Sequence, residues 1–107
     1  MHEFKESDWK VLRELTPLAI ARLCKRILGE VSRACAPESE PYHDRFCRAY
    51  SIMESGNHEL GMAFDNLRRS NALLRLTIMK GRGLITDEEF AKFNEETRRR
   101  VSAGIEA

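Results

Sequence analysis

Few of the residues that mark specialised classes of protein occur in this chain. Its 107 residues include only three cysteines, three prolines and six glycines. An odd, small number of cysteines does not build a disulfide framework, so we expect reduced thiols and a cytoplasmic location. The first residues are polar, unlike the apolar core of a signal peptide, and no apolar run is long enough to cross a membrane. These absences argue against a secreted or membrane protein.

Neither sign of charge dominates the sequence. Eighteen basic residues nearly cancel seventeen acidic ones, and the formal net charge is +1. A protein dedicated to nucleic acid usually carries a clear basic excess, so we do not expect nucleic acid to be the main partner. Charged residues make up 33% of the chain and hydrophobic residues 42%, a balance typical of a folded protein with solvated faces. At this length we expect one helical domain over residues 1–107.

The motifs that supply catalysis or bind cofactors are also missing. No serine or cysteine stands in a pattern that pairs a nucleophile with a base and an orienting group. The glycines at 81 and 83 precede Leu84 and Ile85, whereas a phosphate-binding loop continues with Lys and Ser or Thr. We therefore expect neither an enzyme nor a bound cofactor.

His43 and Cys47 form the only pairing that could begin a soft-metal site. They can share one face of a helix, but they supply two ligands where a structural zinc site needs four. Cys24 and Cys35 fall within an apolar stripe, where a thiol packs as a small hydrophobe. We expect cysteines that pack in the core and no metal, and we keep a metal or ligand sensor using His43 and Cys47 as an alternative.

Helical periodicity is what the sequence contains in abundance. Apolar residues recur at spacings of three and four along most of the chain, and breaks fall at prolines, glycines and capping residues. This pattern predicts an all-α fold: a compact bundle of four to five helices, with a long central fourth helix and a C-terminal helical hairpin. The predicted helices cover about residues 8–15, 17–35, 41–54, 58–80 and 87–101.

Two of these helix boundaries depend on very few residues. Thr16 followed by Pro17 predicts either a new helix start or only a kink in one longer helix. Gly56 predicts the end of the helix over 41–54, because glycine adopts the left-handed conformation at little cost. Within that helix the spacing predicts one apolar stripe: Tyr42, Phe46, Ala49, Tyr50 and Met53.

Residues 81–90, GRGLITDEEF, predict a joint between two helices. Gly81 or Gly83 can end the first helix, and Thr86 can cap the second. Glu89 stands three residues after Thr86, which is the spacing of a capping box. Because the capping rules account for the whole stretch, we interpret it as structural and not as a functional site.

The helix predicted over 58–80 carries the broadest apolar surface. From residue 73 to residue 79, five of seven residues are large and apolar. Such a helix either lies among its neighbours in a bundle or forms the seam of an oligomer, where one polar residue can set the register. The leading hypothesis is a small cytoplasmic protein–protein interaction module that forms a homodimer or binds another protein. The predicted interface comprises Leu60, Leu67, Asn71, Leu74 and Ile78.

An alternative hypothesis is a nucleic-acid-associated regulator that uses a basic face. That face would comprise Arg68, Arg69, Arg75 and Arg82. Against it, the helix that would serve as a recognition helix opens with three acids at 87–89, whose charge repels phosphate.

Overall fold

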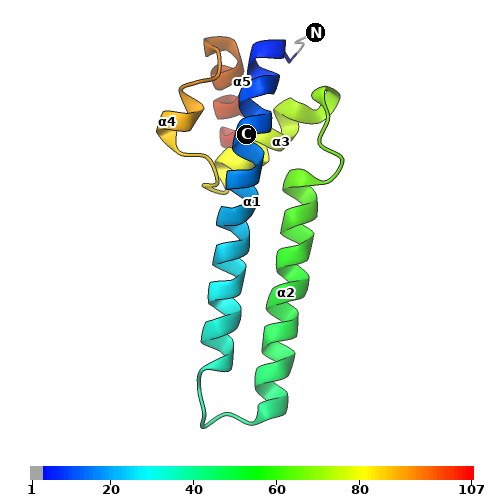
Figure 1. Cartoon of the computed structure of the whole chain (residues 1–107), viewed down its shortest axis with the longest axis vertical. Helices are drawn as coiled ribbons and strands as arrows, with labels where there is room; N and C mark the ends of the chain where they lie inside the picture. Colours follow the sequence, from blue (N-terminus) through cyan, green and yellow to red (C-terminus); the bar gives the residue numbers. More distant parts are fainter. Residues whose placement is uncertain (1–3) are drawn as a thin grey trace.

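The computed structural model describes residues 4–107, and this part of the chain folds into five α-helices and no strand (Figure 1). The all-α prediction is therefore confirmed. The helices are α1 (Glu6–Cys35), α2 (Tyr42–Phe64), α3 (Ala72–Gly81), α4 (Asp87–Phe90) and α5 (Glu95–Glu106), and a 3₁₀ turn, η1 (Arg69–Asn71), precedes α3.

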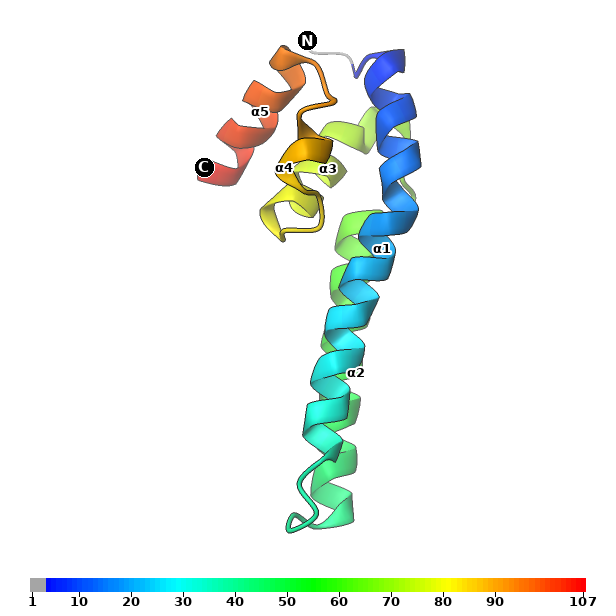
Figure 2. The ribbon, with the colours of Figure 1, turned by 60° about the vertical axis from the view of Figure 1, so that its left-hand side comes forward.

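The molecule is elongated, unlike the compact bundle that the sequence predicts. It measures 54 × 25 × 24 Å with a radius of gyration of 16.7 Å, where a compact chain of this length has about 13 Å. The helices α1 and α2 form an antiparallel hairpin, and α3, α4 and α5 gather on one side of the N-terminal half of α1 (Figures 1 and 2). We call residues 4–22 together with α3–α5 the head, and residues 23–60 the stem.

Helix α1 runs through Thr16 and Pro17 without ending. The hydroxyl of Thr16 donates to the carbonyl of Leu12 at 2.7 Å, and Pro17 lies inside the helix. The segments predicted over 8–15 and 17–35 are therefore one helix of 30 residues. This is the second of the two possibilities that the Thr–Pro pair left open.

Helix α2 also continues past the residue that was predicted to end it. Gly56 is buried in the middle of α2, and a Cβ atom placed there would lie 2.6 Å from Cδ1 of Ile27 in α1. The prediction of a helix end at Gly56 is wrong because this glycine lets two helices approach closely, a use that local sequence does not distinguish from a helix end.

The chain breaks instead at residues 65–68, inside the helix predicted over 58–80. Asn66 adopts a positive φ of 53°, a conformation that asparagine tolerates better than most residues. The side chain of Asn71 then fixes the turn, because it accepts from the Arg68 N–H and donates to the Asn66 carbonyl, both at 2.9 Å. The predicted long central helix is therefore wrong: its first part belongs to α2 and its last part is α3.

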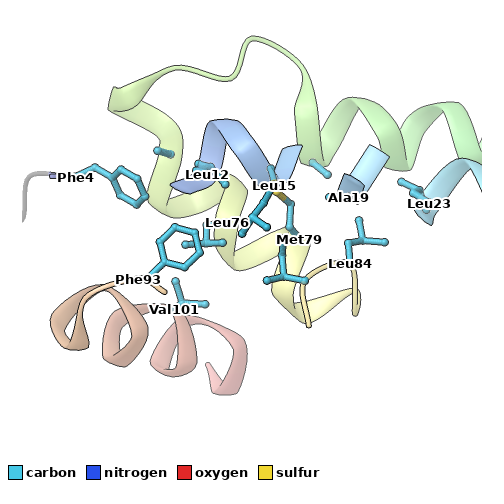
Figure 3. Packing of buried hydrophobic residues seen from close by; sticks show 13 residues of the cluster. Phe4, Leu12, Leu15, Ala19, Leu23, Leu76, Met79, Leu84, Phe93 and Val101 are labelled. Atoms are coloured by element: carbon cyan, nitrogen blue, oxygen red, sulfur yellow. The ribbon is translucent and has the colours of Figure 1, made fainter. Parts of the chain in front are cut away.

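The core lies in the head, where α3 packs between α1 and α5 (Figure 3). Leu76 and Met79 of α3 are fully buried against α1, which contributes Leu12 and Leu15. Phe93 and Val101 close the core from the side of α5. The apolar end of the predicted fourth helix is thus mostly enclosed within one chain.

The joint predicted over 81–90 is confirmed. Gly83 has a φ of 72°, and Thr86 caps α4 by accepting from the Glu89 N–H at 3.1 Å. The Glu89 carboxylate accepts in return from the Thr86 N–H at 2.9 Å, which completes the capping box. The helix predicted over 87–101 is interrupted, however, because Asn94 caps a new helix, α5, by accepting from the Thr97 N–H at 2.9 Å.

A buried carboxylate ties the two ends of the chain together. Asp8, in the first turn of α1, is only 2% exposed. It accepts from the backbone N–H of Asn94 at 3.0 Å, from the Asn94 side chain at 2.5 Å and from the Thr97 hydroxyl at 2.7 Å. Because the partners of Asp8 lie 86 and 89 residues away, the sequence pattern did not predict its role in holding α5.

Two arginines of α1 hold the segment that leads into α4. Arg22 donates to both carboxylate oxygens of Glu89, at 2.7 and 2.9 Å, and to the Leu84 carbonyl. Arg26 donates to the carbonyls of Arg82 and Gly83. Because Arg22 donates to its carboxylate, the pKa of Glu89 is lowered from 4.5 to about 2.

We predict that Thr86→Ala lowers the free energy of unfolding by about 1 kcal/mol, because the Glu89 N–H loses its acceptor. Thr86→Ser keeps a hydroxyl at the same position and should retain most of the stability. Urea denaturation of the three proteins measures both effects. Equal stability of Thr86→Ala and the parent would contradict the assigned cap.

We predict that Glu89→Gln destabilises the protein at neutral pH and that the difference from the parent shrinks as the pH falls from 4.5 towards 2. The pKa of Glu89 is lowered on folding, so its carboxylate stabilises the folded state above the ordinary pKa of 4.5, and this contribution is lost as the pH falls through about 2. The glutamine side chain can still accept from the Thr86 N–H in the capping box. The variant therefore tests only the contribution of the ion pair between Glu89 and Arg22.

The matched control is Glu88→Gln, since Glu88 is exposed and forms no ion pair within residues 4–107. Denaturation midpoints across this pH range should separate the two variants. A pH-independent difference for Glu89→Gln would show that the Arg22 pair adds no stability.

Candidate interaction surface

The stem is covered on only part of its surface. The only buried residues of α2, a helix of 23 residues, are Gly56 and Ala63, and both are small. Yet the stem carries five of the nine large hydrophobic residues that are exposed within residues 4–107. These five are Leu28, Tyr42, Phe46, Tyr50 and Met53.

Two of these exposed residues, Leu28 and Met53, line an apolar groove between the two helices. The groove has a volume of about 210 Å³, and its walls come from both helices. Its lining residues are Cys24, Ile27, Leu28, Met53, Asn57 and Leu60.

Helical spacing extends the same surface along the stem. Tyr42, Phe46 and Tyr50 precede Met53 at intervals of three and four, so they lie on its side of α2. Val31 and Cys35 follow Leu28 in the same way on α1. We call the whole surface the stem face: Cys24, Leu28, Val31 and Cys35 of α1, and Tyr42, Phe46, Tyr50, Met53, Asn57 and Leu60 of α2.

No residue of the stem face is itself charged, although the Arg45 guanidinium lies over the Tyr42 ring at the stem tip, 4.6 Å from its centroid. The opposite side of the hairpin is polar. A second groove, of about 310 Å³, runs along that opposite side and is lined by charged and hydroxyl side chains together with the edges of apolar ones. Its polar residues are Arg26, Glu30, Ser51, Ser55 and Glu59. The hairpin is therefore amphipathic as a unit, with one uncharged face and one polar face.

The stem face points away from the head. Arg22 and Arg26, which bind the segment leading into α4, stand two residues before Cys24 and Leu28 respectively. Two residues correspond to slightly more than half a turn of an α-helix. Cys24 and Leu28 thus lie on nearly the opposite side of α1 from the arginines that hold the head, and no part of the head covers them.

The interface predicted from the sequence is not brought together as one seam. The seven-residue repeat of Leu60, Leu67 and Leu74 is interrupted by the helix break, so Leu60 belongs to α2 and Leu74 to α3. Leu60 lines the stem groove, whereas Leu67 and Ile78 are half-buried against the core of the head. Asn71 holds the turn before α3, and Leu74 remains 59% exposed on the head.

Three of the four arginines of the predicted basic face are engaged in contacts within the head and its junction with α2. Arg69 pairs with Glu6 at 2.8 Å and donates to the Phe4 carbonyl. Arg75 donates to the carbonyl of Met62, and Arg82 pairs with Glu59 at 3.1 Å. The guanidinium of Arg68 reaches only the Asn66 carbonyl, at 3.5 Å. These contacts join α3 and its flanking turns to α1 and α2, and they direct the arginines to different partners.

The cysteines do not occupy the core, contrary to the prediction. Cys35 and Cys47 are exposed and Cys24 is half-buried. The apolar stripe of α1 that contains Cys24 and Cys35 lies on the side of the helix that points away from the head. His43 and Cys47 do meet, with 3.4 Å between Nε2 and Sγ. Within residues 4–107, no group of three or more His, Cys, Asp or Glu side chains is placed to hold a metal ion.

The fold and this surface define an all-α protein built on an amphipathic helical hairpin that extends from a small helical head. Comparisons with protein-family models, with curated proteins and with solved structures gave no match for the chain. Among the described residues, no helix combines the length and the apolar character needed to span a membrane.

Proposed function

We propose that the protein is a protein–protein interaction module that binds its partner through the stem face. The observation that carries this proposal is the exposure of an uncharged stripe with three aromatic residues along a helix that buries only Gly56 and Ala63. Contiguous exposed apolar surface of this kind usually marks an interface. As in the prediction from the sequence, we propose that the protein is cytoplasmic and that it self-associates.

The composition of the stem face suits protein recognition. Aromatic residues and methionine are enriched in interfaces, and charged residues are depleted at their centres. Phe46 and Tyr50 are 66% and 60% exposed, so a partner that covered them would remove two large apolar side chains from water. Rings of this kind dominate binding energies because they bury a large area at a small entropic cost.

The stem face is a better candidate than the surface predicted around Leu74. Leu74 is as exposed as Leu28, 59% against 58%, but its large apolar neighbours in α3 are covered: Leu76 and Met79 are buried in the core, and Leu73 and Ile78 pack partly buried against it. Leu28 instead adjoins the groove that Met53 and Leu60 also line. The nucleic-acid and metal-sensor alternatives have less support, because most of the arginines serve internal contacts and His43 and Cys47 supply only two ligands.

Photo-crosslinking tests the proposal. Benzoylphenylalanine would replace Phe46 on the stem face and, in a separate protein, Ser51 on the polar side of α2, and each protein would be irradiated in the cells that produce it. We predict a discrete crosslinked protein from position 46 and none from position 51. The partner is then identified by mass spectrometry, and its affinity for the purified chain is measured.

Two charge substitutions at equally exposed leucines provide the matched comparison. Leu28→Glu places a charge in the stem face and should abolish the crosslink from position 46. Leu74→Glu places the same charge on the head and should leave the crosslink intact. Loss of the crosslink with Leu74→Glu alone would move the interface to the head, and no crosslink from position 46 would contradict the proposal.

A further inference from the structure

We infer that the partner of the stem face is a second copy of this chain, joined by a two-fold axis parallel to the stem so that α1 of each copy lies over α2 of the other. This inference rests on the proposed function and specifies the partner. The product is a four-helix bundle formed by two stems, with both stem tips at one end and a head on each outer side.

The absence of charge on the stem face favours a copy of itself as the partner. An acidic or basic partner would gain little there, because the residues of the face carry no charge and Arg45 adds one only at the stem tip, over Tyr42. Two-fold symmetry places the same patch on both sides of the interface, so two uncharged stem faces cover each other completely. The two helices of one stem form a single layer, and the stem of the second copy supplies the second layer that packs against it.

The charges that border the stem face determine the orientation of the two copies. Leu23 and Ile52 precede the face residues Cys24 and Met53, and both line the polar side of the hairpin, where α1 and α2 meet. The residues that follow, Lys25 and Glu54, therefore lie on the two outer flanks of the hairpin, because one residue rotates a helix by about 100°. Both are exposed and neither forms an ion pair within the described residues.

With the axis parallel to the stem, the α1 flank of one copy meets the α2 flank of the other. Cys24 and Met53 line one groove, so Lys25 and Glu54 stand at similar levels along the stem. Lys25 of each copy then faces Glu54 of the other copy, and the dimer gains two attractive pairs.

The other face-to-face arrangement has its two-fold axis across the stem. It places α1 over α1 and α2 over α2, with the heads at opposite ends of the dimer. Lys25 would then border the flank that carries Lys25 of the second copy, and Glu54 would border Glu54. Like charges along both flanks disfavour this arrangement.

The head does not obstruct the parallel arrangement. Arg22 and Arg26 bind the head segment on the side of α1 that lies nearly opposite Cys24 and Leu28. In Figure 2 the helices α3, α4 and α5 lie to one side of α1, and the stem extends below these three helices. Two stems can therefore meet face to face with the heads outside.

Charge reversal with sedimentation equilibrium tests the inference. We expect the parent to form a dimer in the micromolar range and Leu28→Glu to be monomeric. Lys25→Glu or Glu54→Lys alone should each weaken the dimer by about tenfold, because two attractive pairs become two repulsive ones. The double variant restores opposite charges on the facing flanks and should regain most of the affinity.

Circular dichroism of each variant provides the control for folding, and the exposed sites predict unchanged spectra. A dimer that is insensitive to both single reversals, or that the double variant does not restore, would overturn this arrangement. A parent that stays monomeric would overturn the second copy as partner. If the parent is monomeric but a different protein is crosslinked from position 46, the proposed function stands and only the homodimer is excluded. If position 46 gives no crosslink at all, both the proposed function and the homodimer are excluded.

Discussion

The arrangement of this molecule depends on one buried carboxylate. Asp8 accepts three hydrogen bonds from Asn94 and Thr97, residues that lie more than 85 positions away in the chain. A carboxylate that is 2% exposed is stable only when such donors compensate for its lost hydration. The same donors would lose their partner if Asp8 were removed, so the contact fixes α5 and, through it, the side of α1 on which the head assembles.

The position of the head in turn decides what remains uncovered. The core residues of α3, α4 and α5 and of the segments between them cover Phe4 and the part of α1 as far as Leu23. The arginine contacts at 22 and 26 mark the lower limit of the head. Beyond that limit α1 has only α2 beside it. Leu28 and Cys35 lie in water although their spacing is that of core residues, because they lie beyond this limit and on the side of α1 that points away from the head.

Local rules predicted the parts of this structure that depend on neighbours in sequence. The capping box at Thr86 and Glu89 and the left-handed Gly83 were correctly derived from GRGLITDEEF, because every partner lies within a few residues. Predictions failed where a distant partner decides the outcome. Gly56 sits against Ile27 and not at a helix end, and periodicity located the apolar side of α2 without indicating what covers it. The turn at Asn66 was missed because the apolar residues on both sides of it keep a helical spacing.

The distribution of buried residues is the physical reason for proposing an interface on the stem. A helix obtains most of its stability from packing an apolar face, and a stable fold needs two layers that cover each other. In the head, α1 and α3 and the chain from Leu84 to Val101 provide those layers around a closed core. In the stem, the one buried residue of α2 is Gly56, which lies against Ile27 of α1 and lets the backbones approach but buries little side-chain area. The exposed large apolar residues of α2 in the stem lie on the neighbouring face, where residues 4–107 supply nothing to cover them: Tyr42, Phe46, Tyr50 and Met53. A second apolar layer placed there would complete the stem in the way that α3 and α5 complete the head.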